Sequence, residues 1–156
     1  MHRLRHVTTK TTKLYVALHE ENSSVKRPAY IELNPQRTHA IATIFSLRSG
    51  NPQLAAIQKF RHNGADDKCS CGQTEDIPHF IEEWKLYEEE RTIIENKLRG
   101  QVLLQLSLLD CCLSSSKYEK KLSSMTKQRQ RTIDNAIKTY MEKCTKIRLE
   151  KLQSAL

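Results

Sequence analysis

Apolar residues recur through most of this chain at spacings of three and four, which is the pattern of amphipathic helices. The first example lies between Asn34-Pro35, a capping residue followed by a proline, and Gly50, a common helix terminator. One face of this segment carries Ile41, Ile44, Phe45 and Arg48. We therefore expect a helix that begins near residue 34 and ends at Gly50.

The middle of the chain repeats this combination of helix start and stop signals. Asn51-Pro52 would begin a second helix and Gly64 would end it, and the short connector implies that the two helices fold back on each other. A third helical pattern starts at Ile77 and stops at Gly100. Trp84 falls on the apolar face of this third segment, where we expect it to be a core aromatic.

The last third of the chain also carries helical patterns. Val102–Leu113 is rich in leucine and should pack in the core, and Ser114-Ser115-Ser116 should be a linker. From about Lys127 we expect a long helix with a narrow apolar seam on one face and basic residues on the others. The seam consists of Ile133, Ile137, Tyr140, Cys144 and Ile147. It either packs on the rest of the domain or pairs two copies of the chain in a homodimer.

Together these patterns predict a mainly α-helical small domain with a long basic C-terminal helix. Residues 1–33 would form a basic N-terminal arm and a short helix at Leu14–Leu18. Residues 34–113 would form the helical core, with a Cys/His turn at 69–84. Residues 114–156 would form a basic helical tail.

The charge is unevenly distributed along the chain. Residues 1–50 carry 8 basic and 3 acidic side chains, residues 51–100 carry 7 and 10, and residues 101–156 carry 11 and 5, for a net charge of +8. Two basic arms therefore flank an acidic centre. Such arms suggest a polyanionic partner, although solubility alone would account equally well for the charge.

The stretch Cys69-Ser-Cys71-Gly72, followed by His79, contains the residue types that zinc prefers as ligands. Two cysteines separated by one residue can converge on one metal ion in a tight turn, and Gly72 supplies the backbone freedom that such a turn needs. Three of the four ligands of a structural zinc site are therefore visible. The competing interpretation is a pair of thiols with no metal.

The five cysteines do not form a disulfide framework, because Cys69/Cys71 and Cys111/Cys112 are too close in sequence to bridge within each pair without strain. No apolar signal sequence lies in the first twenty residues, and the apolar run Val102–Leu109 is too short to span a bilayer. We therefore expect an intracellular location, in the nucleus or the cytoplasm, and no membrane association.

The Cys/His stretch resembles a segment at the C-terminal end of the polyprotein of non-LTR (LINE-type) retrotransposons, downstream of reverse transcriptase and ribonuclease H. That segment has C-x-C-G, an acidic pair, a histidine, a cysteine five residues later, an aromatic residue and Glu-Arg. The matching residues here are Cys69, Cys71, Gly72, Glu75, Asp76, His79, Tyr87, Glu90 and Arg91. The likeness covers roughly residues 11–99, including a lead-in at Leu47-Arg48-Ser49-Gly50 and Leu54-Ala55-Ala56.

The chain departs from this family at one position, because the family's last cysteine is Trp84 here. The resemblance implies a zinc ion held by Cys69, Cys71 and His79. An indole cannot replace the missing thiolate, so the fourth position would be left to a water or to a carboxylate such as Glu83.

The resemblance further implies a non-catalytic tail that binds RNA or DNA, mainly through phosphate contacts. The basic residues that would make these contacts are Arg3, Arg5, Lys10, Lys13, Lys127, Arg129 and Arg131. We expect no enzymatic activity, because the sequence has no P-loop, dinucleotide-binding turn, nucleophile elbow or recognisable pair of nuclease carboxylates. The alternative is a degenerate structural remnant or self-association module without metal or ligand, since one base change converts a cysteine codon to that of tryptophan.

Overall fold

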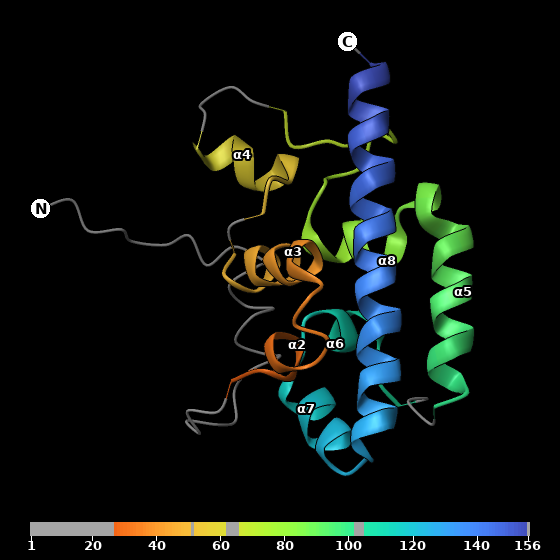
Figure 1. Cartoon of the computed structure of the whole chain (residues 1–156). Helices are drawn as coiled ribbons and strands as arrows, with labels where there is room; N and C mark the ends of the chain where they lie inside the picture. The colour runs from red at the N-terminus through yellow and green to blue at the C-terminus, as the bar shows by residue number, and fades with distance from the viewer. Residues whose placement is uncertain (1–26, 51, 62–65, 102–104, 156) are drawn as a thin grey trace, which may run out of the picture.

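The computed structural model describes residues 27–50, 52–61, 66–101 and 105–155. Within these ranges the chain is mainly helical, which confirms the predicted fold class, and its β-structure is limited to one antiparallel bridge between Lys68 and Thr74. The longest helix, α8 (Lys127–Ser154), runs the height of the molecule, and α3 (Thr38–Arg48) and α5 (Glu88–Arg99) both pack against it (Figure 1).

Helix α8 begins where the sequence pattern predicted. The Thr126 hydroxyl caps it by accepting a hydrogen bond from the Arg129 backbone N–H at 3.4 Å. The four seam residues from Ile133 to Cys144 are buried within the single chain, and Ile147 is half-buried. The seam therefore packs on the rest of the domain, the first of the two arrangements considered for it.

Helix α3 begins later and faces differently than predicted. Asn34 does not cap it: this residue has a φ of +44°, and its side-chain amide donates to the Asp134 carboxylate of α8 at 2.8 Å. The buried face consists of Ala40, Ile44 and Leu47, while the side chain of Phe45 is 60% exposed. The position of α8 decides which face is buried, and apolar spacing within α3 alone does not reveal that.

A short helix, α2 (Ala29–Glu32), precedes α3 and was not predicted. Lys138 of α8 completes its C-terminal end, because the fully buried ammonium donates to the carbonyls of Leu33 and Asn34. The same ammonium lies 2.8 Å from the buried Asp134 carboxylate. Burial raises the pKa of Asp134 above its ordinary value, although its hydrogen bonds from Lys138 and Asn34 act in the opposite direction.

Helix α4 (Ala55–Arg61) starts after Leu54, later than Asn51-Pro52 suggested. Its first turn is anchored to the Cys/His turn, because the Ala55 N–H donates to the Glu75 carboxylate at 2.6 Å. The predicted stop at Gly64 lies outside the described residues, as do the N-terminal arm and the predicted helix at Leu14–Leu18.

The predicted continuous helix from Ile77 to Gly100 is wrong, because the chain breaks at Trp84. A π-helical turn η1 (His79–Glu83) is followed by Trp84 in an extended conformation, a 3-10 turn η2 (Lys85–Tyr87) and then α5, whose end at Gly100 agrees with the prediction. The Ile81 carbonyl accepts from the Tyr140 hydroxyl at 2.6 Å rather than continuing a helix. Trp84 is nevertheless buried in the core, as predicted.

Two short helices connect α5 to α8. Helix α6 (Leu108–Cys112) opens with a Ser107/Asp110 capping box, and α7 (Ser116–Ser123) is capped by Ser115. Ser114 and Ser115 are buried, so the serine run is a helix start rather than a linker. One buried core extends from Tyr30 to Cys144 and so crosses the three predicted regions. No helix within the described ranges is long and apolar enough to span a bilayer.

Candidate metal centre

The first part of the Cys/His turn (residues 69–84) is folded by its own backbone. The Cys69 N–H donates to the Gln73 carbonyl at 2.8 Å, and the Gly72 N–H donates to the Cys69 carbonyl at 2.9 Å. Gly72 has a φ of +87°, and no atom would lie within 4 Å of a Cβ placed there. Glycine is therefore required by the backbone conformation and not by a lack of space.

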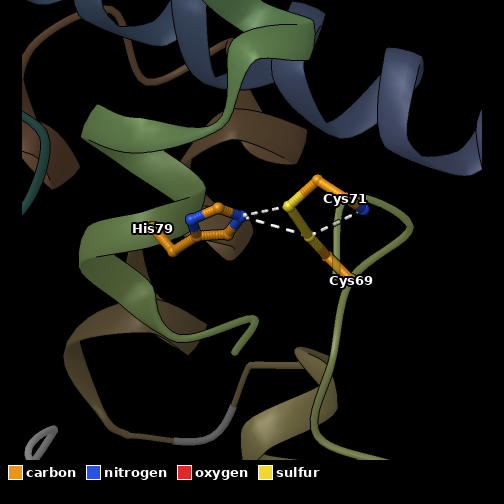
Figure 2. A group of neighbouring side chains, drawn as sticks. All are labelled: Cys69, Cys71 and His79. Atoms are coloured by element: carbon orange, nitrogen blue, oxygen red, sulfur yellow. Dashed lines mark hydrogen bonds between the residues drawn. A yellow bond between two sulfur atoms is a disulfide. The ribbon is translucent and has the colours of Figure 1, made fainter. Parts of the chain in front are cut away.

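This turn brings together the three residues predicted as metal ligands. His79 Nε2 lies 3.2 Å from the Cys69 sulfur and 3.3 Å from the Cys71 sulfur (Figure 2). Their ligand atoms all lie within 4.8 Å of one another, so the group could hold a metal ion. Among the described residues, no further cysteine, histidine or carboxylate joins the group.

The two sulfurs are joined as a disulfide in this structure, with the Cα atoms 5.3 Å apart. The turn holds the two Cα atoms at a distance usual for disulfides, and the expectation that a pair separated by a single residue cannot bridge without strain stays a prediction. A metal ion would be bound by the reduced pair, since the thiolate is the metal-binding form of cysteine. Metal binding and the disulfide thus exclude each other.

His79 is held in place from three sides. Its backbone N–H donates to the Asp76 carboxylate at 2.9 Å, and its ring stacks on the Trp84 indole with centroids 6.0 Å apart. Nδ1 is buried without a hydrogen-bond partner among the described residues, and the Glu83 carboxylate lies 3.5 Å away. A carboxylate behind the non-ligating nitrogen is the usual support of a metal-binding histidine. Glu83 is therefore placed to support the ligand and not to replace the fourth one.

Trp84 lies next to His79 because of the π-helical turn. The Trp84 N–H donates to the His79 carbonyl at 2.9 Å, an i to i+5 bond that places the two residues one turn apart. The indole packs edge-on against Tyr87, with centroids 5.0 Å apart. This position, which the resemblance assigns to a fourth thiolate, is therefore occupied by a packed aromatic ring.

The acidic residue Glu75 anchors the turn to α8, a role that the sequence did not reveal. Its buried carboxylate receives two hydrogen bonds from the Arg148 guanidinium, at 2.6 and 2.9 Å. The pKa of Arg148 is raised: burial would lower it, but the hydrogen bonds and the charge of Glu75 outweigh that effect. Only the acidic pair in the resemblance drew attention to Glu75, and no local signal identified Arg148.

Other residues that carry the resemblance also have structural contacts. The Arg91 guanidinium donates to the Trp84 carbonyl at 2.6 Å, which satisfies the backbone where the helix is broken. The Glu90 carboxylate accepts from Lys143 of α8 at 2.8 Å. Tyr87 is fully buried, and this burial raises the pKa of its hydroxyl far above the ordinary value. These contacts hold the chain around the break.

The remaining cysteines differ from Cys69 and Cys71 in their surroundings. Cys111, Cys112 and Cys144 are free thiols buried in the core. Burial raises the pKa of Cys111 and of Cys144 to about 12, and that of Cys112 well above its ordinary value. They are therefore unreactive packing groups, and the reactive sulfur chemistry of this chain is confined to the Cys/His turn.

The basic residues predicted to contact nucleic acid fall into two groups. Lys127 and Arg131 are exposed at the start of α8, whereas Arg129 is half-buried and donates to the Gln101 side chain at 2.9 Å. The others (Arg3, Arg5, Lys10 and Lys13) lie outside the described residues.

Comparisons with family models, curated proteins and solved structures found no match to this chain. Its function must therefore be inferred from its own residues.

Proposed function

We propose that this chain is a non-catalytic nucleic-acid-binding domain whose Cys/His turn is held by a zinc ion, as its resemblance to the LINE-type C-terminal segment implies. The supporting observation is the convergence of Cys69, Cys71 and His79, which the resemblance names as ligands, on one point. Two thiolates and an imidazole are a donor set typical of zinc. When bound, the ion would supply a cross-link between the first part of the turn and η1.

The two sulfur–nitrogen distances suit zinc, whereas the two sulfurs, which are joined in this structure, would have to separate on reduction. With bonds of about 2.3 Å to sulfur and 2.0–2.1 Å to nitrogen, a tetrahedral zinc ion keeps its sulfur and nitrogen ligands about 3.5 Å apart. The two sulfur–nitrogen distances here are 3.2 and 3.3 Å. Glu83 behind Nδ1 would hold the ring with Nε2 directed at the ion. The proposed role is structural, because the surrounding groups are packing and anchoring groups.

Nucleic-acid binding is the proposed role of the domain as a whole, and it is supported by the net charge of +8 and the clustering of that charge toward both ends of the chain. The buried carboxylates of Glu75 and Asp134 are each tied to a cation, Arg148 and Lys138. Because these carboxylates are paired with cations in the core, they stabilise the fold and are not placed for catalysis. Affinity would come mainly from phosphate contacts.

One observation favours the second candidate, a structural remnant that binds no metal. Trp84 fills the fourth position and packs against His79 and Tyr87, so the turn is held together without a fourth thiolate. In this case the protein would fold equally well in chelator, and the three remaining ligands would have no measurable affinity for zinc.

The two candidates are separated by metal content and nucleic-acid binding. Protein purified under reducing conditions without added zinc should contain close to one zinc ion per chain, and His79→Ala should remove it. His39→Ala is the matched control, because His39 is exposed on α3. The parent should also bind a labelled 20-base-pair duplex or single-stranded RNA in fluorescence anisotropy. Zinc-free parent protein would support the remnant, and zinc-containing protein without affinity for either nucleic acid would contradict the proposed function.

Restoring the missing thiolate provides a sharper test of the metal centre. Trp84→Cys should cost about 3–5 kcal/mol of folding free energy in chelator, since a large buried aromatic is truncated. Zinc should recover part of that loss, because a four-ligand site binds the folded chain preferentially. Trp84→Ser is the control, with the same cavity but no sulfur. If zinc shifts the thermal melts of both variants equally, residue 84 does not reach the metal position.

A further inference from the structure

The corner between α7 and α8, residues 116–131, is the most one-sided charged part of the described chain. It contains six basic side chains and one acidic side chain. Five of the six basic residues are exposed, and Arg129 is half-buried. The corner lies at the opposite end of α8 from the part that contacts the Cys/His turn (Figure 1). We call these residues the basic corner.

Four of the five exposed basic residues of the corner form two like-charged pairs. Lys117 and Lys121 lie four residues apart on α7 and are both exposed, on a face beside the buried Tyr118. Lys127 and Arg131 repeat this spacing on the first turns of α8. Like charges at this spacing repel each other and disfavour an isolated helix. The arrangement thus disfavours each helix in the free protein, and neutralisation of the pairs by anionic groups would relieve the repulsion.

The single acidic residue of the corner does not neutralise these charges. The Glu119 carboxylate is turned toward α2 and the α6–α7 connection, where it accepts hydrogen bonds from the Ala29 N–H at 3.0 Å and from the Ser114 hydroxyl. The first turn of α8 contains no acidic residue, so the positive end of that helix dipole adds to the charge of the lysines.

Within the described residues, four of the five basic residues elsewhere on α8 are matched by carboxylates, Lys151 being the exception. Lys143 pairs with Glu90, Arg148 with Glu75, and Lys138 with Asp134. By contrast, Lys117, Lys121, Lys127 and Arg131 form no ion pair with any described residue. These four side chains are therefore available to an anion outside the described part of the chain.

We propose that the basic corner is the surface that contacts the phosphodiester backbone of the bound nucleic acid, with Lys117, Lys121, Lys127 and Arg131 as the contact residues. This inference rests on the proposed function and narrows it to one surface. Two of these residues, Lys117 and Lys121, were not among those that the sequence suggested. Contacts of this kind neutralise phosphates without reading bases, so binding is tolerant of sequence.

The basic corner lies far from the candidate metal site, so nucleic-acid binding and metal binding can be tested separately. Lys127 and Arg148 are 21 residues apart on one helix, which corresponds to about 30 Å at 1.5 Å per residue. The Cys/His turn, which contacts Arg148, is therefore remote from the basic corner. Variants of the corner should leave zinc content unchanged, and loss of zinc should affect binding only through the stability of the fold.

The test compares two quadruple variants of the whole chain that lose the same charge. The first replaces Lys117, Lys121, Lys127 and Arg131 with glutamine. The matched control replaces four exposed lysines beside the Cys/His turn, on η2 and on the distal half of α8: Lys68, Lys85, Lys146 and Lys151. Affinity for a labelled 20-base-pair duplex is measured by anisotropy between 50 and 200 mM salt, with a thermal melt and zinc content for each protein.

The corner variant should bind about tenfold or more weakly, and the slope of log affinity against log salt should fall by about 0.9 for each phosphate that is no longer neutralised. The control variant should stay within about threefold of the parent, because screening limits the effect of charges that do not touch phosphate. If the parent binds and both variants weaken equally, the proposed surface is wrong while nucleic-acid binding stands. If the parent binds no nucleic acid, both proposals fail. If polyglutamate displaces the labelled duplex as well as unlabelled nucleic acid does, the partner of the basic corner is an acidic protein instead of nucleic acid.

Discussion

The two ends of α8 carry similar numbers of basic residues, but within the described residues only the distal end pairs some of them with carboxylates of other segments. At the distal end, Arg148 is mostly buried and hydrogen-bonded to Glu75, and Lys143 is paired with Glu90. At the proximal end, Lys127 and Arg131 are exposed and have no ion pair with a described residue. Burial and the presence of a facing carboxylate, and not the density of charge along the sequence, decide whether a basic residue supports the fold or remains available to a partner.

This difference also separates two kinds of expected variant. Substitutions at the distal end should change stability with little direct effect on binding, and substitutions at the proximal end should do the reverse. The buried seam runs between the two ends and should affect both, since it holds α8 in the core. Three of the five predictions below test this division and two concern the thiols, and they run from the largest expected effect to the smallest.

Breaking the Glu75–Arg148 pair should have the largest effect. Arg148→Met removes the guanidinium and leaves a buried carboxylate without its cation, which should lower the free energy of unfolding by about 3–5 kcal/mol. Lys146→Met is the control, because its 3.9 Å contact with Glu150 is exposed and worth at most about 1 kcal/mol. Urea unfolding measures both. Equal losses would show that Arg148 contributes no more than a surface charge.

Truncating a seam residue should have the second-largest effect on the free energy of unfolding. Ile137→Ala should lower the free energy of unfolding by about 2–5 kcal/mol, because Ile137 is buried against the core. The partly exposed Ile93 of α5 supplies the control, and Ile93→Ala should cost about 0.5 kcal/mol or less. Light scattering should give the same mass for the parent and both variants. A parent dimer that Ile137→Ala converts to a folded monomer would mean that the seam pairs two chains.

The thiols should divide into two classes in reactivity. After reduction and in chelator at pH 8, an alkylating reagent should modify Cys69 and Cys71 only, and mass spectrometry should show all five cysteines modified once the chain is unfolded. Zinc should protect the first two. Modification of Cys111 or Cys144 in the folded protein would contradict their placement in the core.

The buried thiols also predict how stability depends on pH. A thiol whose pKa is higher in the folded than in the unfolded chain stabilises the fold while it is protonated. For Cys111 and Cys144 this contribution is complete below the ordinary pKa of 9.0 and is lost as the pH rises toward about 12. Stability should therefore fall above pH 9, and thermal melts of Cys144→Ala should show a shallower fall.

The smallest change in stability is expected at the basic corner. Lys117→Gln with Lys121→Gln should leave the free energy of unfolding unchanged or raise it by about 0.2–0.5 kcal/mol, since repulsion along α7 is removed. Lys143→Gln is the contrasting variant, because it removes the ion pair with Glu90 and should destabilise by up to about 1 kcal/mol. A clear loss of stability in the Lys117/Lys121 variant would show that these lysines support the fold.

Several features of the fold could be predicted from local sequence because local interactions decide them. The start of α8 at Lys127 follows from the Thr126 cap and the seam, and the end of α5 follows from Gly100. The proximity of Cys69, Cys71 and His79 also follows from short-range geometry, since a glycine-assisted turn and one helical turn are enough to bring them together.

The features that could not be predicted depend on contacts between distant segments. The break at Trp84 is stabilised by Arg91 and by the Tyr140 hydroxyl, which bond to backbone carbonyls that a continuous helix would use. The exposed orientation of Phe45 is set by the packing of α3 on α8. The anchoring of Glu75 by Arg148 spans 73 residues of sequence. Periodicity and motif spacing contain no information about such partners.

The Glu75–Arg148 pair has a consequence for the order of events during synthesis. Translation at about 5–20 residues per second takes roughly 4–15 s to cover the 73 residues between the two partners. During that interval the Cys/His turn has emerged, but the arginine that neutralises its buried carboxylate has not. We therefore expect the turn to meet solvent, oxidants and metal ions before it joins the helical domain, which requires the distal half of α8.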